Sequence, residues 1–186
     1  MMPEISLNIL DVAENSVRAR ASLIEIAVSV QPKEDTLSVT ITDNGCGMSA
    51  DQVKRAQDPF FTTRTTRIVG LGLPFFKQAA ECTGGSFRID SEKGKGTTVS
   101  AVFVLSHIDR MPLGDISSTI HTLIVFNEQI DFKYTYEYED KSFTLDTREM
   151  REMLGDEISF MEPEVSLFIW EYLDNNKNET DGGAEI

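Results

Sequence analysis

Apolar and polar residues alternate with two different periods along the first 105 residues, and these periods predict the secondary structure. Apolar residues recur every three or four positions over residues 6–19, which predicts an opening helix. Residues 23–30 and 37–41 alternate with a period of two, which is typical of half-buried strands. Because only the turn at residues 32–35 separates them, we expect these strands to form a hairpin.

Helix signals and a segment without periodicity follow the hairpin. Ser49 and Gln52 form a capping-box pattern that starts a short helix. Residues 57–72 show no periodicity and predict a mobile loop, whereas residues 73–82 predict a helix with Pro74 in its first turn. Two further strands are expected, at residues 86–91 and 97–105.

A boundary is expected near residues 109–114, where Pro112 and Gly114 interrupt the pattern. Beyond it, four aromatic side chains share one strand face at period two, and we expect them to pack in a small core, with a docking surface as the alternative. These aromatics are Phe132, Tyr134, Tyr136 and Tyr138. The elements expected here are a helix (115–126), two strands (130–138 and 142–145), a helix from its cap Thr147 to Gly155, a helix (163–173) and a disordered tail (174–186).

The distribution of charge separates the two parts of the chain. The net charge of −14 divides into −1 for residues 1–105 and −13 for residues 106–186. An acidic second part repels nucleic acid and anionic membranes, so the partner we expect is a protein with a basic surface. Acidity that serves only solubility remains an equally open alternative.

Composition excludes several other classes. The longest apolar run, residues 101–105, is too short to span a bilayer. The first residues lack a signal sequence, and Cys46 and Cys82 make neither a disulfide framework nor a metal motif. We therefore expect a cytoplasmic protein.

Candidate chemistry begins on the opening helix, where Asn8, Asp11 and Asn15 fall on one face. An asparagine oxygen suits Mg²⁺ that keeps phosphate and water in its shell, and a carboxylate one turn earlier can orient or deprotonate a water. An amphipathic helix with its polar face in solvent explains the same pattern, so this stripe alone is ambiguous.

A second signal follows the second strand, where Asp43 begins the run Asp-Asn-Gly-Cys-Gly-Met. A buried aspartate at a strand end is a good acceptor for an exocyclic amino group, and Gly45 and Gly47 allow the backbone to approach a flat base. The alternative is a plain Asp-Asn-Gly turn.

A third signal is the run Gly70-Leu71-Gly72-Leu73 that enters the predicted helix at 73–82. Glycines at a helix N-terminus expose backbone N–H groups to an anion, where the helix dipole is favourable. Arg64 and Arg67, together with nearby threonines, are suitable donors to the outer phosphates. The fourth signal, Gly94 to Thr98, would alone indicate a hairpin turn.

The four signals in this order resemble the GHKL ATPases, which include the ATP-binding domains of histidine kinases, gyrase, MutL and the anti-sigma-factor kinases. The resemblance covers about residues 5–105. Residues 14–26 are similar to the N box, 43–47 to the G1 box, 60–62 to the F box, 70–85 to the G2 box and 94–97 to the G3 box.

By this resemblance, ATP and Mg²⁺ are the expected cofactors. Asn15 would hold Mg²⁺, Asp43 would accept from the adenine amino group with help from Thr97, and residues 58–72 would form the ATP lid. Asp11 is the expected catalytic residue. The residues expected to contact the nucleotide are Asn8, Asn15, Asp43, Gly45, Gly47, Met48, Phe60, Thr62, Thr63, Arg64, Arg67, Gly70, Leu71, Gly72, Leu73 and Thr97.

The resemblance also implies an α/β two-layer sandwich, a mixed sheet covered on one face by helices. We expect it over residues 1–106, followed by a small acidic α-β-β-α accessory domain over residues 107–173 and the tail at 174–186.

Three departures from the family pattern bear on the reaction. Asp11 stands where hydrolysing members have Glu and many kinases have Asn, and Ile68 replaces the first lid glycine, which predicts a stiffer and shorter lid. No phosphoacceptor helix precedes the domain in this sequence. Neither His107 nor His121 has the acidic neighbour of an acceptor site.

These features favour an ATPase or protein kinase that acts on a separate partner protein. A catalytically silent, nucleotide-gated module that binds a protein is the alternative. An ATP-driven dimer clamp of the MutL type ranks third, because we find no arm for strand exchange.

Overall fold

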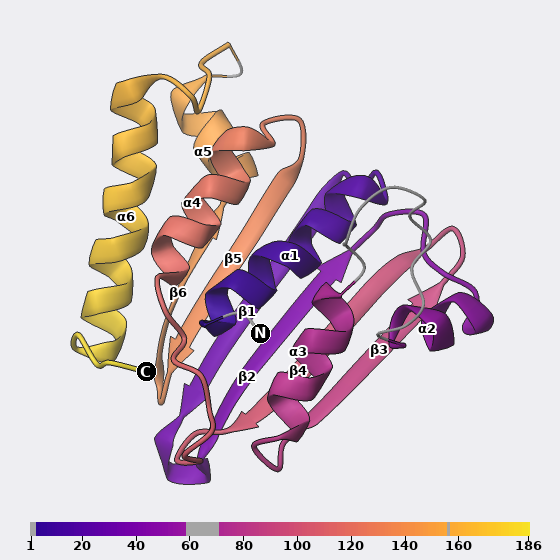
Figure 1. The fold of residues 1–186 in the computed structure, drawn as a ribbon. Helices are drawn as coiled ribbons and strands as arrows, with labels where there is room; N and C mark the ends of the chain where they lie inside the picture. The colour runs from indigo at the N-terminus through magenta and orange to yellow at the C-terminus, as the bar shows by residue number, and fades with distance from the viewer. Residues whose placement is uncertain (1–2, 59–70, 156) are drawn as a thin grey trace.

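A computed structural model describes residues 3–58, 71–155 and 157–186 of the chain. Its centre is one six-stranded mixed sheet in the order β3-β4-β2-β1-β5-β6 (Figure 1). Only the pairing of β1 with β5 is parallel, and the other four pairings are antiparallel. The strands are β1 (Leu23–Gln31), β2 (Thr36–Asp43), β3 (Ser86–Glu92), β4 (Gly96–Val104), β5 (Asp131–Tyr138) and β6 (Lys141–Asp146).

Helices cover one face of this sheet, as Figure 1 shows for α1, α3, α4 and α6. The predicted hairpin and the capping box at Ser49 are confirmed. The helices are α1 (Ile5–Arg18), α2 (Ala50–Ala56), α3 (Gly72–Glu81), α4 (Ile116–Phe126), α5 (Thr147–Leu154) and α6 (Pro163–Asp181), and a 3₁₀ turn spans Pro32–Glu34. Along the described ranges, no helix is both long and apolar enough to cross a membrane.

The period-two alternation of the strands decides which face the helices cover. Ile24, Ile26, Val28 and Val30 of β1 are buried, while Glu25 and its alternate neighbours point to the other face. β2, β4 and β5 repeat this alternation. The helix-covered face therefore carries the core, in agreement with the expected two-layer α/β sandwich.

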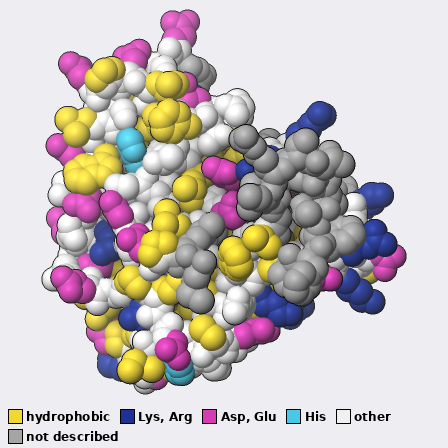
Figure 2. Space-filling view, in the orientation of Figure 1, with side chains coloured by type: hydrophobic (Ala, Val, Ile, Leu, Met, Phe, Trp, Pro, Cys, Tyr) yellow, Lys and Arg dark blue, Asp and Glu magenta, His cyan; other side chains and the backbone are white. Residues whose placement is uncertain are grey.

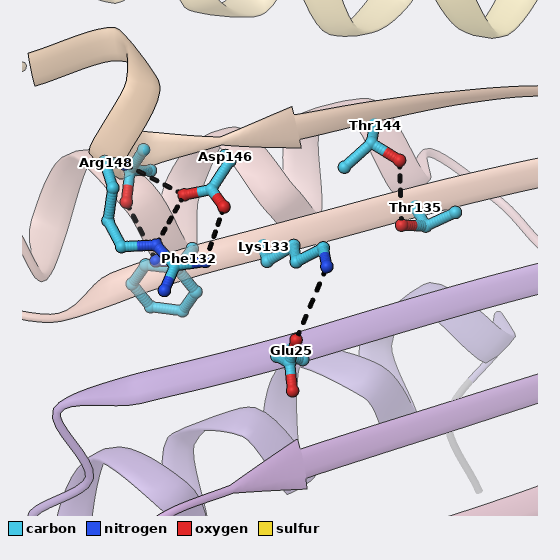
Figure 3. A network of polar contacts seen from close by, with 8 residues as sticks. Glu25, Phe132, Lys133, Thr135, Thr144, Asp146 and Arg148 are labelled. Carbon is cyan, nitrogen blue, oxygen red and sulfur yellow. Dashed lines mark hydrogen bonds and ion pairs between the residues drawn. The ribbon is translucent and has the colours of Figure 1, made fainter. Parts of the chain in front are cut away.

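Polar side chains occupy the opposite face of the sheet. Figure 3 shows this face at β1, β5 and β6, where Lys133 Nζ lies 3.8 Å from Glu25 Oε1 and Thr135 Oγ1 lies 3.0 Å from Thr144 Oγ1. Such exposed cross-strand pairs contribute little stability, about 0.2–1 kcal/mol each. The stability of the sheet therefore comes mainly from apolar side chains buried on the helix-covered face.

The structure does not confirm a separate C-terminal domain. β5 pairs with β1 from Leu23↔Asp131 to Val30↔Tyr138, so the second part of the chain extends the first sheet. Among the predicted core aromatics, Phe132, Tyr134 and Tyr136 are buried against the helices, as expected. Because apolar positions show which face of a strand is buried and not which strand lies beside it, the pattern could not distinguish two sheets from one.

The prediction of a disordered tail is wrong, because α6 continues to Asp181. The Asp181 carboxylate accepts from Tyr136 Oη at 2.8 Å and pairs with Lys177 Nζ at 2.8 Å. The backbone N–H of Leu113 donates to the carbonyl of Ile186, which ties the end of the chain to the segment before α4. These contacts compensate for the low helix propensity of the Asn- and Asp-rich sequence.

The N-cap of α5 also differs from the prediction. Asp146, not Thr147, caps the helix by accepting from the backbone N–H of Arg148. The Thr147 hydroxyl instead accepts from the backbone N–H of Phe132 at 2.9 Å, and Thr147 is fully buried. Both residue types cap helices well, and the tertiary contact at Phe132 decides between them.

Candidate functional site

The polar stripe on α1 faces the start of α3. Asn8, Asp11 and Asn15 lie on one face of α1, and Asn8 is 1% exposed. Asn8 Nδ2 donates to the carbonyl of Glu4, whereas its buried Oδ1 has no hydrogen-bond partner among the residues that the structure describes. Because Asn8 is buried, the alternative that it lies in solvent on a simple amphipathic helix is excluded. A buried acceptor without a hydrogen bond also costs stability.

The carboxylate of Asp11 lies directly against the first residue of α3. A Cβ atom on Gly72 would collide with Asp11 Oδ2, so only glycine allows this approach. The N-cap residue Leu71 makes no side-chain cap bond to the helix, and the N-terminus of α3 lies beside Asp11. A site with a carboxylate and a helix N-terminus side by side is suited to a metal-bound anion.

Asn15 lies one turn further along α1 and is half-buried. Its Oδ1 accepts from Arg18 Nη1 at 2.9 Å, and Arg18 also pairs with Glu14 at 2.8 Å. Because an amide oxygen has two lone pairs, one remains for a further donor or a cation.

Asp43 ends β2 and is almost fully buried, at 8% exposed. Its Oδ2 accepts from the Ser16 hydroxyl at 2.6 Å, and its Oδ1 accepts from the backbone N–H of Gly45 at 2.8 Å. The two donors fix the carboxylate plane while each oxygen keeps lone-pair capacity for an exocyclic amino group. Ser16 adjoins Asn15 in the chain, so α1 connects the two polar centres.

Thr97 lies opposite Asp43 in the β2–β4 register. Its Oγ1 lies 2.8 Å from Ser91 Oγ, and the Ser91 hydroxyl accepts from the backbone N–H of Met48 at 2.8 Å. Ser91 therefore joins residues 43–48 to Thr97, which was predicted to help Asp43 hold the adenine amino group.

The glycines after Asp43 allow close packing of the protein's own backbone. Gly47 has φ +63°, and a Cβ there would overlap the carbonyl of Glu92, while a Cβ on Gly96 would overlap the carbonyl of Asp43. The approach of Gly45 and Gly47 to a flat base stays a prediction. The close contact observed is with the β3–β4 turn.

Three contributors had no clear signal in the sequence. Ser16 and Ser91 are single hydroxyls in ordinary positions, and Asn44 holds the start of β1 by accepting from the N–H groups of Ser22 and Leu23 at 2.9 and 3.0 Å. The run Asp-Asn-Gly after a strand was the only available hint. Its asparagine has a structural function.

The structure brings together Asn8, Asp11, Asn15 and Gly72 at one place, and Asp43, Gly45, Met48 and Thr97 at another. Leu71 and Leu73, on either side of Gly72, are half-buried. Predicted contacts at Phe60, Thr62, Thr63, Arg64, Arg67 and Gly70, and the departure at Ile68, lie outside the described residues.

The donors present fit a magnesium nucleotide better than a metal held by protein alone. Over the described part of the chain, no group of three or more His, Cys, Asp or Glu residues could hold a metal ion. Mg²⁺ in nucleotide sites takes one or two protein oxygens and completes its shell with phosphates and water. Asn15 Oδ1, the Asp11 carboxylate and the unpaired Asn8 Oδ1 are oxygen donors on one face of α1.

Comparisons with known proteins identify the family of this chain. Residues 4–107 match the family described as histidine kinase-, DNA gyrase B-, and HSP90-like ATPase. A probable C4-dicarboxylate sensor kinase of Bacillus subtilis is 37% identical over 78 residues, covering 42% of this chain and 15% of that protein. The signal transduction histidine-protein kinase AtoS of Escherichia coli is 30% identical over 107 residues, covering 57% of this chain and 17% of that protein.

The chain thus spans less than a fifth of the length of these two relatives. Among solved structures, the N-terminal domain of a DNA repair protein has a TM-score of 0.54 at 15% identity, covering 78% of this chain and 53% of that one. This likeness concerns the fold alone. Because the family match takes in more than half of the chain, including the α1 stripe, Asp43 and the start of α3, the chain belongs to the histidine kinase-, DNA gyrase B- and HSP90-like ATPases.

Proposed function

We propose that this protein binds ATP with Mg²⁺ between α1, the end of β2 and the start of α3, and transfers the γ-phosphate to water or to a separate partner protein in regulation. Relatives with sensor-kinase names support a regulatory role. The place of action that fits is the cytoplasm, where ATP is available.

The observation that carries the proposal is the contact between Asp11 and Gly72. It puts a carboxylate beside the N-terminus of α3, in the middle of the stripe that also contains Asn8 and Asn15. A carboxylate, an amide oxygen and a helix N-terminus are the groups that phosphoryl transfer requires from a protein scaffold, because positioning and charge stabilisation dominate that chemistry.

Each residue then has a distinct function. Asp43, fixed by Ser16 and Gly45, accepts from the adenine amino group. Asn15 provides the protein oxygen to Mg²⁺, which neutralises phosphate charge when bound. Asp11 orients the water or acceptor hydroxyl that attacks the γ-phosphate. Arg64 and Arg67 remain sequence-based candidates for the phosphate clamp.

The fate of the γ-phosphate tests the reaction. Purified protein with Mg²⁺ and γ-labelled ATP should release or transfer label, and Asp11→Asn should slow this at least about 100-fold with nucleotide still bound. The matched control is Glu14→Gln, which removes a carboxylate from the same helix at a position paired with Arg18. If Asp11→Asn turns over like the wild type, Asp11 has no chemical function.

Tight binding with neither release nor transfer would instead identify the nucleotide-gated module. Because this outcome keeps the binding site and removes only the reaction, binding and turnover must be measured on the same sample.

A further inference from the structure

The outer surface of α6 exposes four large apolar side chains within two turns of the helix. Leu167 is 56% exposed, Phe168 50%, and Trp170 and Tyr172 37% each. Ile169 and Leu173, on the opposite side of the helix, are fully buried against the rest of the molecule. We call Leu167, Phe168, Trp170 and Tyr172 the α6 face. Leu167 lies beside Trp170 and Phe168 beside Tyr172, with Glu164 and Glu171 between the two pairs. Scattered exposed apolar residues are normal, but four on two turns of one helix are typical of an interaction site.

Contacts with neighbouring elements hold the aromatic rings of the α6 face. Trp170 Nε1 donates to Ser118 Oγ of α4 at 3.2 Å. The Tyr172 ring lies 6.3 Å from the Phe168 ring and 6.4 Å from the Phe143 ring of β6. A partner would therefore meet side chains that are already ordered, which lowers the entropic cost of binding.

Acidic residues lie between and beside the apolar side chains of the α6 face, and basic residues are absent from this stretch of sequence. Glu162, Glu164, Glu171 and Asp174 flank or interrupt the apolar positions, and no Lys or Arg occurs between Arg151 and Lys177. Figure 2 shows hydrophobic and acidic side chains mixed over the left of the molecule, where Figure 1 places α6. The partner must therefore combine an apolar contact with positive charge.

This charge pattern also decides which kind of molecule can bind to the α6 face. A second copy related by a two-fold axis would bring Glu164, Glu171 and Asp174 of both chains together, in a protein of net charge −14. Nucleic acid and anionic lipid surfaces are repelled for the same reason. A protein segment with a basic rim remains.

We propose that the α6 face docks a basic amphipathic helix of a partner protein. Leu167 and Phe168 pack against an apolar stripe of that helix, and Glu164, Glu171 and Asp174 pair with Lys or Arg beside the stripe. Residues 164–174 span about 15 Å, so a partner helix of about three turns covers the face. This inference goes beyond the proposed function and does not depend on the nucleotide site.

The single tryptophan of the chain makes the proposal directly measurable, because Trp170 emission reports on the α6 face alone. The probe is a tryptophan-free, 18-residue peptide of Leu and Lys arranged as an amphipathic helix, and its control is the same composition in scrambled order. We expect a saturable blue shift of Trp170 emission with the first peptide and at least about tenfold weaker binding of the scrambled one.

Phe168→Glu separates apolar docking from simple charge attraction. It adds negative charge, so it would strengthen a purely electrostatic contact, whereas it should weaken docking about tenfold or more. Ile108→Glu is the matched control, since Ile108 is 93% exposed outside α6 and undergoes the same change. Glu164→Lys combined with Glu171→Lys, a second variant, should also weaken binding of the helical peptide.

Equal binding of both peptides, or unchanged binding by Phe168→Glu, would overturn the proposal. A wild-type dimer in sedimentation that Phe168→Glu dissociates would identify a second copy as the occupant and would also overturn it. ATP binding by Phe168→Glu should equal that of the wild type, so failure here is distinguishable from failure of the nucleotide site.

Discussion

The Asp43 carboxylate depends on a residue that no motif emphasised. Ser16 donates to Oδ2 from α1, and Gly45 donates to Oδ1 from the loop after β2. The side chain expected to read adenine is therefore oriented by two elements before any ligand arrives. Such preorganisation keeps the carboxylate from turning away on binding.

Ser16→Ala should weaken ATP binding about three- to tenfold and lower the free energy of unfolding by about 1 kcal/mol, because a buried hydrogen bond to Asp43 is lost. Calorimetric titration and urea denaturation measure the two effects. Ser6→Ala is the control, since this buried serine on the same helix bonds Glu4 instead. If both variants bind ATP alike, Ser16 does not position Asp43.

Gly47→Ala should destabilise the protein more than Gly94→Ala. Both residues have positive φ, at +63° and +82°, so both substitutions incur a backbone cost of about 1–2 kcal/mol. At Gly47 the new methyl group also meets the Glu92 carbonyl, whereas nothing lies within 4 Å at Gly94. The extra loss in urea denaturation should be about 1–3 kcal/mol. Equal losses would contradict the close packing described here.

At the scale of elements, the strands and helices follow their hydrophobic periods, and tertiary contacts decide where they end. The alternation in β1 and β2 predicts the hairpin, and the helix period predicts α1 and α4. The end of α6 was missed because Asp181 is stabilised by Tyr136 of β5, 45 residues earlier, and no local pattern contains that pair. The same limitation hid the buried hydroxyl of Thr147.

Tyr136→Phe should lower the free energy of unfolding by about 1.5–3 kcal/mol, because the Tyr136 hydroxyl donates to the buried Asp181 carboxylate. Burial, assisted by the hydrogen bond to Asp181, raises the pKa of Tyr136, so the hydroxyl stays a donor at neutral pH. Tyr134→Phe is the control, because Tyr134 Oη has no hydrogen-bond partner in the described part of the chain and its loss should cost nothing. Hydrogen exchange should show faster opening of residues 174–181 only in Tyr136→Phe.

Asp146 makes the β6–α5 junction sensitive to acid. Hydrogen bonding from the Arg148 side chain lowers the pKa of the Asp146 carboxyl in the folded state (Figure 3). Its stabilising contribution is therefore complete above the ordinary carboxyl pKa of about 4 and is lost as the pH falls through the lowered folded value.

Asp146→Asn, which retains the cap, should lower stability at pH 7 and converge with the wild type as the pH falls through the lowered folded pKa of Asp146. Urea midpoints measured at a series of pH values test this. Asp140→Asn, on the exposed β5–β6 turn, is the control for loss of one charge. A constant difference between Asp146→Asn and the wild type at all pH values would exclude the ion pair as its cause.

At the scale of the molecule, the sequence predicted the α/β sandwich and the candidate site better than it predicted the assembly of the chain. The order of the motifs along the chain was enough to predict that Asp11, Asn15 and Asp43 lie on or beside α1. The parallel pairing of β1 with β5 joins residues more than 100 positions apart, and the expected boundary at residue 106 falls within the resulting single sheet. Non-local strand pairing leaves no trace in local periodicity.

Calorimetric titration with ATP, with and without Mg²⁺, tests most directly whether Asp11 and Asn15 on α1 and Asp43 at the end of β2 belong to one nucleotide site. The wild type should bind one ATP more tightly with Mg²⁺. Asp43→Ala should bind about 10–100-fold more weakly in both conditions, whereas Asn15→Ala should lose only the gain from Mg²⁺. Absence of ATP binding by the wild type, or a full Mg²⁺ effect in Asn15→Ala, would contradict the account.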